Sequence, residues 1–254
     1  MPATEAKLYV ILGSHSCRTG MLLLEHKGIP YRRIEVPTGL HPLALRLLGF
    51  EGNARPLRST GERPNRPLAT LDRLGTVPAL RMGGERVKTN RAIARFLDQH
   101  HPAQPLFPQD PDQRSGVEEA ERWGDEVFQM TARRLVLAAT VRGEDGLIDG
   151  GDRGRLGPLL FRSAATRRFA SYAFGRVIFA AGPSRERELS LELGNMLDRV
   201  DAWIDAGVLG GERLYAADFM IAPSLALLCY RPDARANIER RPALALVDRI
   251  LPEP

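Results

Sequence analysis

The chain has 254 residues and a mass of 28.1 kDa, which suits one large domain or two small ones with a proper core. Its contents of 43% hydrophobic and 26% charged residues are ordinary globular values and argue against disorder. The apolar runs are too short to span a bilayer, and the N-terminus lacks the basic-then-apolar pattern of a secretion signal. We therefore expect a soluble, cytoplasmic protein that does not insert into membranes.

The cysteine content and the net charge narrow the function classes further. Cys17 and Cys229 are too few for a disulfide scaffold and lack metal-ligand spacing, so we expect no metal site. The net charge of +5 raises the possibility of nucleic-acid binding. The basic residues are 33 arginines and 3 lysines spread over the whole chain, which indicates a coding bias more than a phosphate-binding surface. We therefore place an anion- or nucleic-acid-binding module last among the candidate functions.

The first hundred residues alternate between strand and helix patterns. A short apolar run predicts a strand over 8–12, and periodic apolar positions predict a helix over 17–27 that ends at Gly28. A strand over 31–36 and a short helix over 42–48 follow, and then a long surface excursion over 51–75. Next come a hairpin of 77–82 with 86–88 across two glycines, and an amphipathic helix for which we predict Asn90 as the N-cap. This order implies a small mixed sheet covered by helices.

Two predicted helix starts carry the best clue to function. Ser14, His15, Ser16 and Cys17 follow the first strand, and Thr89-Asn90 opens the later helix, with Thr76-Val77-Pro78 between them in the chain. Helix starts present unpaired backbone N–H groups and favour negative charge. Two such starts beside a strand edge bounded by a proline suggest a cradle for a small acidic thiol.

The remainder of the chain is helical in pattern. Residues 102–111 hold four prolines and indicate a linker, and a helical stripe runs over 112–142. We predict Ser184 as the N-cap of a further helix, and two more helices over 216–230 and 235–250, the second interrupted by Pro242. The expected fold is therefore two-domain: an α/β domain over 1–101, a linker over 102–111 and an all-α domain over 112–254.

The segment 153–179 stands out for its composition. It contains six arginines, no acidic residue and five aromatic residues. The pattern fits a helix whose aromatic side chains pack inward, and it also fits a patch that faces an anion or a membrane surface. Both interpretations remain open.

Several motifs occur together in an order that resembles a known family. They are Leu8-Tyr9 with 14–17, the helix end at 24–31, Thr76-Val77-Pro78-Ala79-Leu80, residues 91–98, the linker residues 105–108, and Ala217-Asp218-Phe219 with Ala222-Pro223-Ser224. Together they resemble the cytosolic glutathione S-transferases over nearly the whole chain. The resemblance implies a thioredoxin-like N-terminal domain, an all-helical C-terminal domain, glutathione as cosubstrate and a homodimer.

The resemblance also implies roles for individual residues. Ser14 occupies the catalytic, thiol-activating position, and Pro78 matches a cis-proline that turns the backbone of Val77 toward the cysteinyl part of glutathione. Thr89 and Asn90 lie where the family binds the γ-glutamyl end. The possible accessory residues are His15, Ser16 and Cys17. Cys17 resembles the second cysteine of a redox CxxC pair in which Ser14 replaces the first cysteine. Either a buried packing thiol or an active thiol fits this position.

The chain departs from the family pattern at three places. Thr89-Asn90 replaces an acidic residue followed by serine, so the acidic partner for the ligand's ammonium is missing. Tyr215 replaces the serine or threonine of a capping box that retains Asp218, so the reciprocal cap is at best half present. The excursion 51–75 carries arginines that either contact the ligand's glycyl carboxylate or belong to a disordered insertion: Arg55, Arg58, Arg63 and Arg66.

Two functions remain open at this point. The first is a detoxifying transferase that activates the thiol of glutathione, or of a related thiol, for attack on an electrophile bound against the helical domain. The second is a non-catalytic ligand-binding or regulatory protein on the same scaffold. The sequence does not name the electrophile.

Overall fold

The computed structural model describes residues 5–11, 13–52, 75–142, 155–156 and 172–252. The predicted excursion over 51–75 lies almost entirely outside these residues, as does most of the arginine-rich segment 153–179. The roles suggested for Arg55, Arg58, Arg63 and Arg66 therefore stay predictions.

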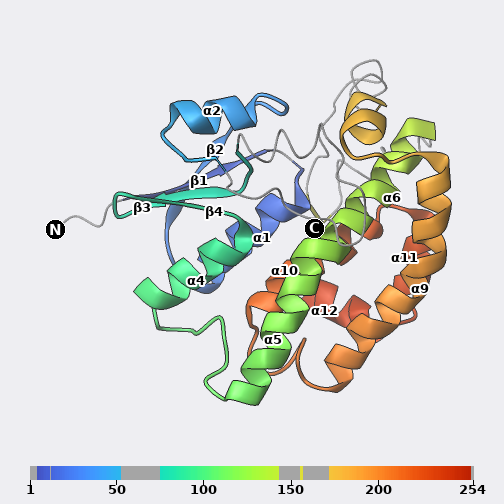
Figure 1. Cartoon of the computed structure of the whole chain (residues 1–254). Coiled ribbons are helices and arrows are strands. Elements are labelled where there is room, and N and C mark those ends of the chain that lie inside the picture. Colours follow the sequence, from blue (N-terminus) through green and yellow to red (C-terminus); the bar gives the residue numbers. More distant parts are fainter. Residues whose placement is uncertain (1–4, 12, 53–74, 143–154, 157–171, 253–254) are drawn as a thin grey trace.

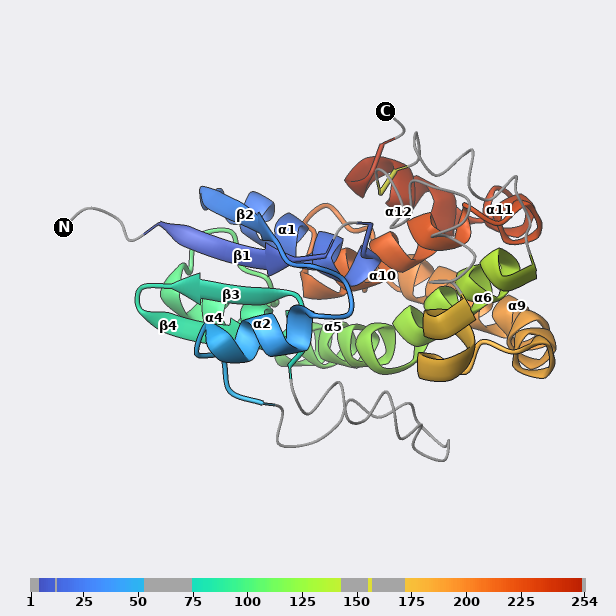
Figure 2. The same cartoon turned by 90° about the horizontal axis from the view of Figure 1, so that it is seen from above.

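A four-stranded mixed sheet organises the N-terminal part (Figures 1 and 2). The strands β1 (Ala6–Val10), β2 (Tyr31–Glu35), β3 (Ala79–Met82) and β4 (Glu85–Lys88) lie in the order β2-β1-β3-β4. The β1 and β2 strands are parallel, with Leu8 opposite Arg33, and the other two pairings are antiparallel. The central strand β1 is almost wholly buried because its apolar residues face helices on both sides of the sheet. The first strand ends at Val10, two residues earlier than predicted.

Helices cover both faces of this sheet. The helices α1 (His15–His26) and α4 (Asn90–His100) pack side by side on one face, and α2 (His41–Leu47) lies on the other (Figure 1). Gly28 ends α1 with φ of +64°, as predicted, and Gly83-Gly84 form the predicted hairpin turn with positive φ.

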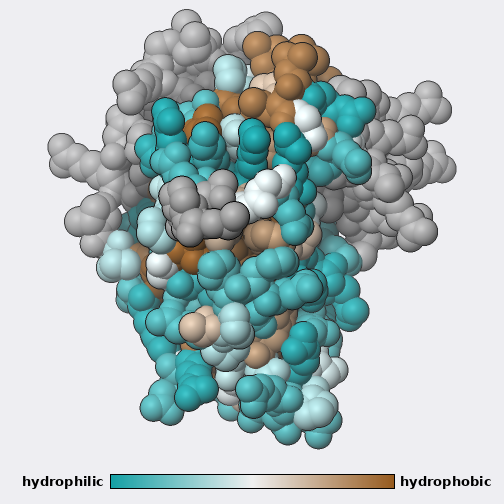
Figure 3. Space-filling model, turned by 90° about the vertical axis from the view of Figure 1, so that its left-hand side faces the viewer, coloured by the Kyte–Doolittle hydropathy of each residue, from teal (hydrophilic) through white to brown (hydrophobic). Residues whose placement is uncertain are grey.

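The outer face of α2 is apolar and exposed. Leu40, Leu43 and Leu47 recur at helical spacing and are 62%, 59% and 81% exposed, with Leu48 beside them. This apolar surface lies over α2 at the top of Figure 3.

The C-terminal part is a helical domain. Its elements, in chain order, are α5 (Pro111–Trp123), the π-helical turn η1 (Gly124–Phe128), α6 (Gln129–Arg142), the π-helical turn η2 (Ala173–Ile178), α9 (Pro183–Asp205), α10 (Ala216–Leu228), α11 (Pro232–Ile238) and α12 (Pro242–Ile250). Together with the sheet domain they confirm the predicted fold class: a thioredoxin-like domain followed by an all-α domain. The exact domain limits at 101 and 112 stay predictions.

The central helix α10 joins the two domains. Every residue from Ala216 to Leu228 is buried, because the helix is apolar on all sides and neighbours surround it (Figure 2). It packs against α1 of the sheet domain and against α5, η1, α6 and α12. Gly124 makes the close approach of η1 possible, since a Cβ there would lie 3.0 Å from Met220 Cγ and 3.1 Å from Ile221 Cγ1.

Two buried polar groups fix the ends of these helices. Lys27 follows α1, and its buried Nζ donates to Asp98 Oδ1 at 2.8 Å and to the carbonyl oxygens of His101 and Ala103. Asp218 accepts from the N–H groups of Tyr215 and Gly210 at 2.7 and 2.6 Å, while Tyr215 makes no side-chain cap hydrogen bond. The capping box is therefore half present, as the sequence indicated.

One predicted cap in this domain is wrong. The N-cap of α9 is Gly182, and Pro183 occupies the first helical position, so the helix begins before Ser184. Proline is favoured at that position because its fixed φ suits a helix and its missing N–H would have had no partner there.

Candidate functional site

The site begins where β1 turns into α1. Gly13, with φ of +66°, reverses the chain, and Ser14 then caps α1 with an extended backbone. The Ser14 Oγ accepts from the N–H of Cys17 at 3.3 Å, a hydrogen bond that does not use the hydroxyl hydrogen. Ser14 is partly exposed, whereas the next three residues are buried. Among these four residues the Ser14 hydroxyl is therefore the group best placed to meet a ligand.

His15 faces the helical domain. It is 3% exposed, and its Nε2 lies 3.2 Å from the carbonyl oxygen of Gln129, the first residue of α6. Burial, reinforced by the positive charge of Arg133, lowers the pKa of His15 to about 3. The imidazole is therefore neutral at physiological pH and donates from Nε2 to Gln129, which ties α1 to α6.

Cys17 lies beneath the start of α1. Its side chain is fully buried, and its Sγ accepts from the N–H of Ile11 at 3.5 Å. Burial raises the pKa of this thiol above its ordinary value, although the hydrogen bond with Ser14 acts in the opposite direction. A buried, protonated thiol of this kind has the properties of a packing residue.

The start of α4 corrects one prediction. Thr89, not Asn90, is the N-cap: it has φ of +70°, and its Oγ1 accepts from the N–H of Ala92 at 3.3 Å. Asn90 is the first helical residue and is 2% exposed. Its Nδ2 donates to the carbonyl oxygen and the Oγ of Ser16, at 3.0 and 3.1 Å. Both amide hydrogens of Asn90 therefore hold α4 against α1, and the Ser16 hydroxyl is engaged in the same contact.

Val77 and Pro78 complete the surroundings of α1. The Val77–Pro78 peptide bond is cis, as the resemblance implied, and both residues are buried just before β3. Gly20 of α1 lies directly against the proline, because a Cβ there would be 3.1 Å from Pro78 Cβ and Cγ and 3.5 Å from Asn90 Oδ1. The structure thus brings Pro78 and the α4 start against α1, and the binding of a thiol at this place stays a prediction.

An ion-pair network that the sequence did not reveal joins α4 to the helical domain. Arg95 makes a two-point contact with Glu121 of α5, both distances being 2.8 Å, and Glu121 is fully buried. Arg91 lies 3.5 Å from Glu121 and 3.2 Å from Glu126 of η1. Burial, with the neighbouring carboxylates of Glu121 and Glu126, raises the pKa of Asp125 to about 6. Acidic groups therefore gather near the α4 start, but they are supplied by α5 and η1.

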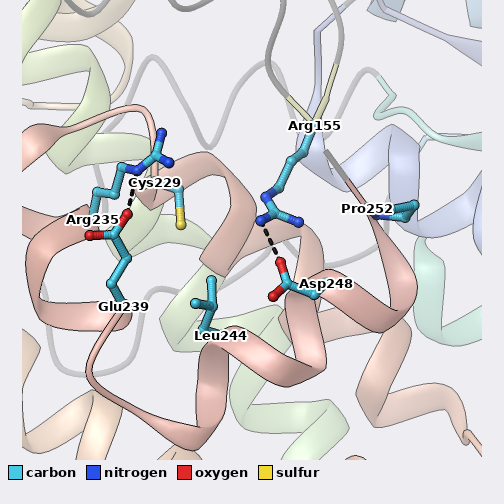
Figure 4. Close-up of a pocket in the computed structure, with 7 residues that line it drawn as sticks. All are labelled: Arg155, Cys229, Arg235, Glu239, Leu244, Asp248 and Pro252. Atoms are coloured by element: carbon cyan, nitrogen blue, oxygen red, sulfur yellow. Dashed lines mark hydrogen bonds and ion pairs between the residues drawn. The ribbon is translucent and has the colours of Figure 1, made fainter. Parts of the chain in front are cut away.

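A separate cavity of about 440 Å³ lies in the helical domain, at the C-terminal end of α10 and beside α11 and α12 (Figure 4). Two ion pairs border it, Arg235–Glu239 at 2.7 Å and Arg155–Asp248 at 2.5 Å, with the Cys229 thiol between them. Burial raises the pKa of Cys229 to about 11. A thiol that stays protonated between two paired arginines is a poor nucleophile.

A family model matches the N-terminal part of the chain. Residues 8–105 match the model of the glutathione S-transferase N-terminal domain. This part of the chain therefore has the N-terminal domain of that family. No curated protein matches the sequence.

Several solved structures share the fold over nearly the whole chain. The beta-etherase LigF of Sphingobium sp. strain SYK-6 is 18% identical with a TM-score of 0.63, and the alignment covers 98% of this chain and 96% of LigF. A glutathione S-transferase of Ceriporiopsis subvermispora, solved in complex with glutathione, is 18% identical with a TM-score of 0.59, and the alignment covers 98% of this chain and 97% of the other. A glutathione S-transferase of Methylobacterium radiotolerans, solved in complex with glutathione sulfonate, is 19% identical with a TM-score of 0.52, and the alignment covers 97% of this chain and 90% of the other. At these identities the likeness establishes the fold.

Membrane-spanning and metal-binding features are not found in the part of the chain that the structure describes. Within it, no helix is long and apolar enough to cross a membrane. Nor do the described residues contain a group of three or more histidine, cysteine or acidic side chains arranged to hold a metal ion.

Proposed function

We propose that this protein activates the thiol of glutathione, or of a closely related thiol, for attack on an electrophile. The match of residues 8–105 to the family's N-terminal domain supports this proposal, and two proteins of the same fold were solved with glutathione or glutathione sulfonate. The observation that carries it is the partly exposed Ser14 hydroxyl at the N-terminus of α1, with Cys17 buried behind it.

The chemistry assigned to Ser14 is stabilisation of a thiolate. A hydroxyl that donates to sulfur favours the thiolate over the thiol, and the N-terminus of α1 adds a favourable field. The thiol proton leaves to solvent, the sulfur then forms a bond to the electrophilic carbon, and the leaving group departs with its electron pair. In this proposal Val77, Pro78, Thr89 and Asn90 form the walls of the glutathione site, and His15, Ser16 and Cys17 support the α1 end of it.

A conjugation assay with glutathione and an aromatic halide tests the role of Ser14. Ser14→Ala removes one charge-assisted hydrogen bond, which lowers kcat/KM by roughly 10- to 100-fold. Ser184→Ala, at an exposed serine of α9, is the matched control and keeps full activity. A further readout is the pKa of bound glutathione, followed by thiolate absorption, which rises in Ser14→Ala. Equal activity of Ser14→Ala and the wild type would contradict the assignment.

A non-catalytic binding or regulatory protein is the second candidate, and one observation favours it. Both amide hydrogens of Asn90 are committed to Ser16, so this side chain has no N–H left for the γ-glutamyl end of glutathione. Calorimetric titration with glutathione separates the two candidates. Binding together with turnover supports the transferase, whereas a folded protein that fails to bind glutathione supports the second candidate.

The homodimer and the cytoplasmic location belong to the proposal as well. Both rest on the family resemblance, and sedimentation of the purified protein tests the dimer.

A further inference from the structure

A row of basic side chains crosses the whole sheet on one of its faces. The strand register places Lys7 of β1 opposite both Arg32 of β2 and Arg81 of β3. Arg81 in turn lies opposite Arg86 of β4. Residues directly opposite each other on neighbouring strands share a face, and the strands lie about 4.8 Å apart, so the four cations extend over about 14 Å. We call this row the basic ladder.

Two contacts show that the basic ladder lies on the same face of the sheet as α2. The Arg86 Nε donates at 3.1 Å to the carbonyl oxygen of Leu48, the residue at which α2 ends. Tyr9 lies two residues after Lys7, hence on the same face of β1, and packs edge to face against Phe50 after α2, with ring centres 5.4 Å apart. The outer side of α2 is therefore turned in the same direction as the ladder.

The positive charge of the basic ladder is accessible and is not neutralised by ion pairs. Arg32, Arg81 and Arg86 are exposed, and Lys7 is partly exposed. Within the described part of the chain, no acidic side chain forms an ion pair with any of the four. Arg81 and Arg86 are like charges placed directly opposite each other, an arrangement that lowers the stability of a sheet. An anionic surface bound here would offset this repulsion.

The outer side of α2 adds an apolar stripe next to the ladder. Leu40, Leu43 and Leu47 recur at helical spacing, and all three are more than half exposed, so they protrude from the surface. Arg46 of α2 and Glu51 after it contribute one exposed charge of each sign beside the stripe. The stripe lies at the top of Figure 3, with a band of hydrophilic residues directly beneath it. Exposed apolar patches bordered by polar residues mark protein or membrane contacts.

We propose that the leucine stripe of α2 and the basic ladder together bind the surface of an anionic lipid bilayer. Leucines of an amphipathic surface enter the boundary between headgroups and acyl chains, while arginine and lysine contact anionic headgroups. Because α2 lies over the sheet, its leucines stand further out than the ladder and reach deeper into the bilayer (Figure 1). A nucleic acid would use the cations but would leave the protruding leucines in water. The contact is peripheral, and it is independent of the proposed thiol chemistry.

Co-sedimentation of the full-length protein with lipid vesicles tests this proposal. One set of vesicles contains phosphatidylcholine alone, and the other contains phosphatidylcholine and phosphatidylserine in equal parts. We expect the wild type to bind the mixed vesicles at low salt, to bind phosphatidylcholine far more weakly, and to be largely released at high salt. Arg32→Gln combined with Arg81→Gln should lower the partition coefficient for mixed vesicles roughly 10- to 30-fold. Leu43→Gln combined with Leu47→Gln should lower it roughly tenfold or more.

Control variants remove the same kinds of side chain from the helical domain. Arg122→Gln combined with Arg187→Gln removes two exposed arginines from α5 and α9, and Leu191→Gln removes an exposed leucine from α9. Both controls should bind the mixed vesicles as the wild type does. Urea unfolding establishes that each variant is folded, and Arg81→Gln alone should be at least as stable as the wild type because it removes the like-charge pair.

Four outcomes would overturn the proposal. The first is a wild type that does not bind the mixed vesicles, and the second is an equal loss of binding in the arginine control, since net charge would then explain the binding. The third is a loss in the arginine double variant without any loss in the leucine double variant, which indicates a purely electrostatic surface for a nucleic acid or an acidic protein. The fourth is a wild type that sediments as a dimer without lipid while Leu43→Gln with Leu47→Gln sediments as a monomer, because the stripe is then an interface between two copies.

Discussion

The buried histidine at the start of α1 makes a contribution to stability that is lost in acid. His15 is neutral in the folded protein because its pKa is lowered to about 3, against an ordinary value of 6.5. As the pH falls below 6.5, the unfolded chain takes up a proton that the folded protein does not, and the folded state loses stability down to about pH 3. We therefore expect His15→Gln, which keeps a donor for the Gln129 carbonyl oxygen, to reduce this loss.

The size of the effect follows from the two pKa values. At pH 5 the pH lies about one and a half units below the pKa of histidine in the unfolded chain. Proton binding to His15 therefore stabilises the unfolded state by about 2 kcal/mol between pH 7.5 and pH 5. Asp125 and Asp218, whose pKa values burial raises to about 6, act in the opposite direction over the same range. Their effect is common to both proteins, so it cancels in the difference between the wild type and His15→Gln.

Urea unfolding at pH 7.5 and pH 5 measures this difference. The wild type should lose about 2 kcal/mol more stability than His15→Gln between the two pH values. His100→Gln is the control, since it removes a partly exposed histidine from α4. If the free energies of unfolding of the wild type and His15→Gln change in parallel with pH, the histidine is not held neutral by burial and the reasoning fails.

Three other predictions concern the contacts that hold the site in place. Lys27→Met removes the buried ammonium that binds Asp98 and two carbonyl oxygens, and should lower the free energy of unfolding by roughly 2–4 kcal/mol in urea titrations; Lys7→Met on β1 is the control. Asn90→Ala should lower the free energy of unfolding by about 1–3 kcal/mol. A double-mutant cycle with Ser16→Ala should show a coupling energy of at least about 0.5 kcal/mol, and additive effects of the two substitutions would exclude the hydrogen bonds between these residues as the cause. Glu121→Gln should lower the free energy of unfolding by about 1–3 kcal/mol, measured by thermal and urea unfolding. Glu119→Gln, which breaks an exposed ion pair with Arg199, should lower it by less than about 1 kcal/mol, and equal losses would contradict the importance of burial.

Local sequence signals located most of the secondary structure. The apolar run of β1, the stop at Gly28 and the two-glycine hairpin were readable because each depends on residues that are neighbours in the chain. The cap positions were less certain. Thr89 and Asn90 are both good caps, so sequence alone could not decide between them, and Pro183 moved the start of α9 ahead of Ser184.

The sequence by itself determined the two-domain fold, a helix that follows the first strand and the resemblance to the family, because periodicity, turn residues and motif order are local properties. The predicted helix over 17–27 begins two residues earlier, at His15. Only the tertiary structure decided what each polar group contacts. Asn90 meets Ser16 across 74 positions, and His15 meets Gln129 across 114. Hydrogen bonds and charges act through space, so such partners are fixed by packing and leave no signal in the spacing of the chain.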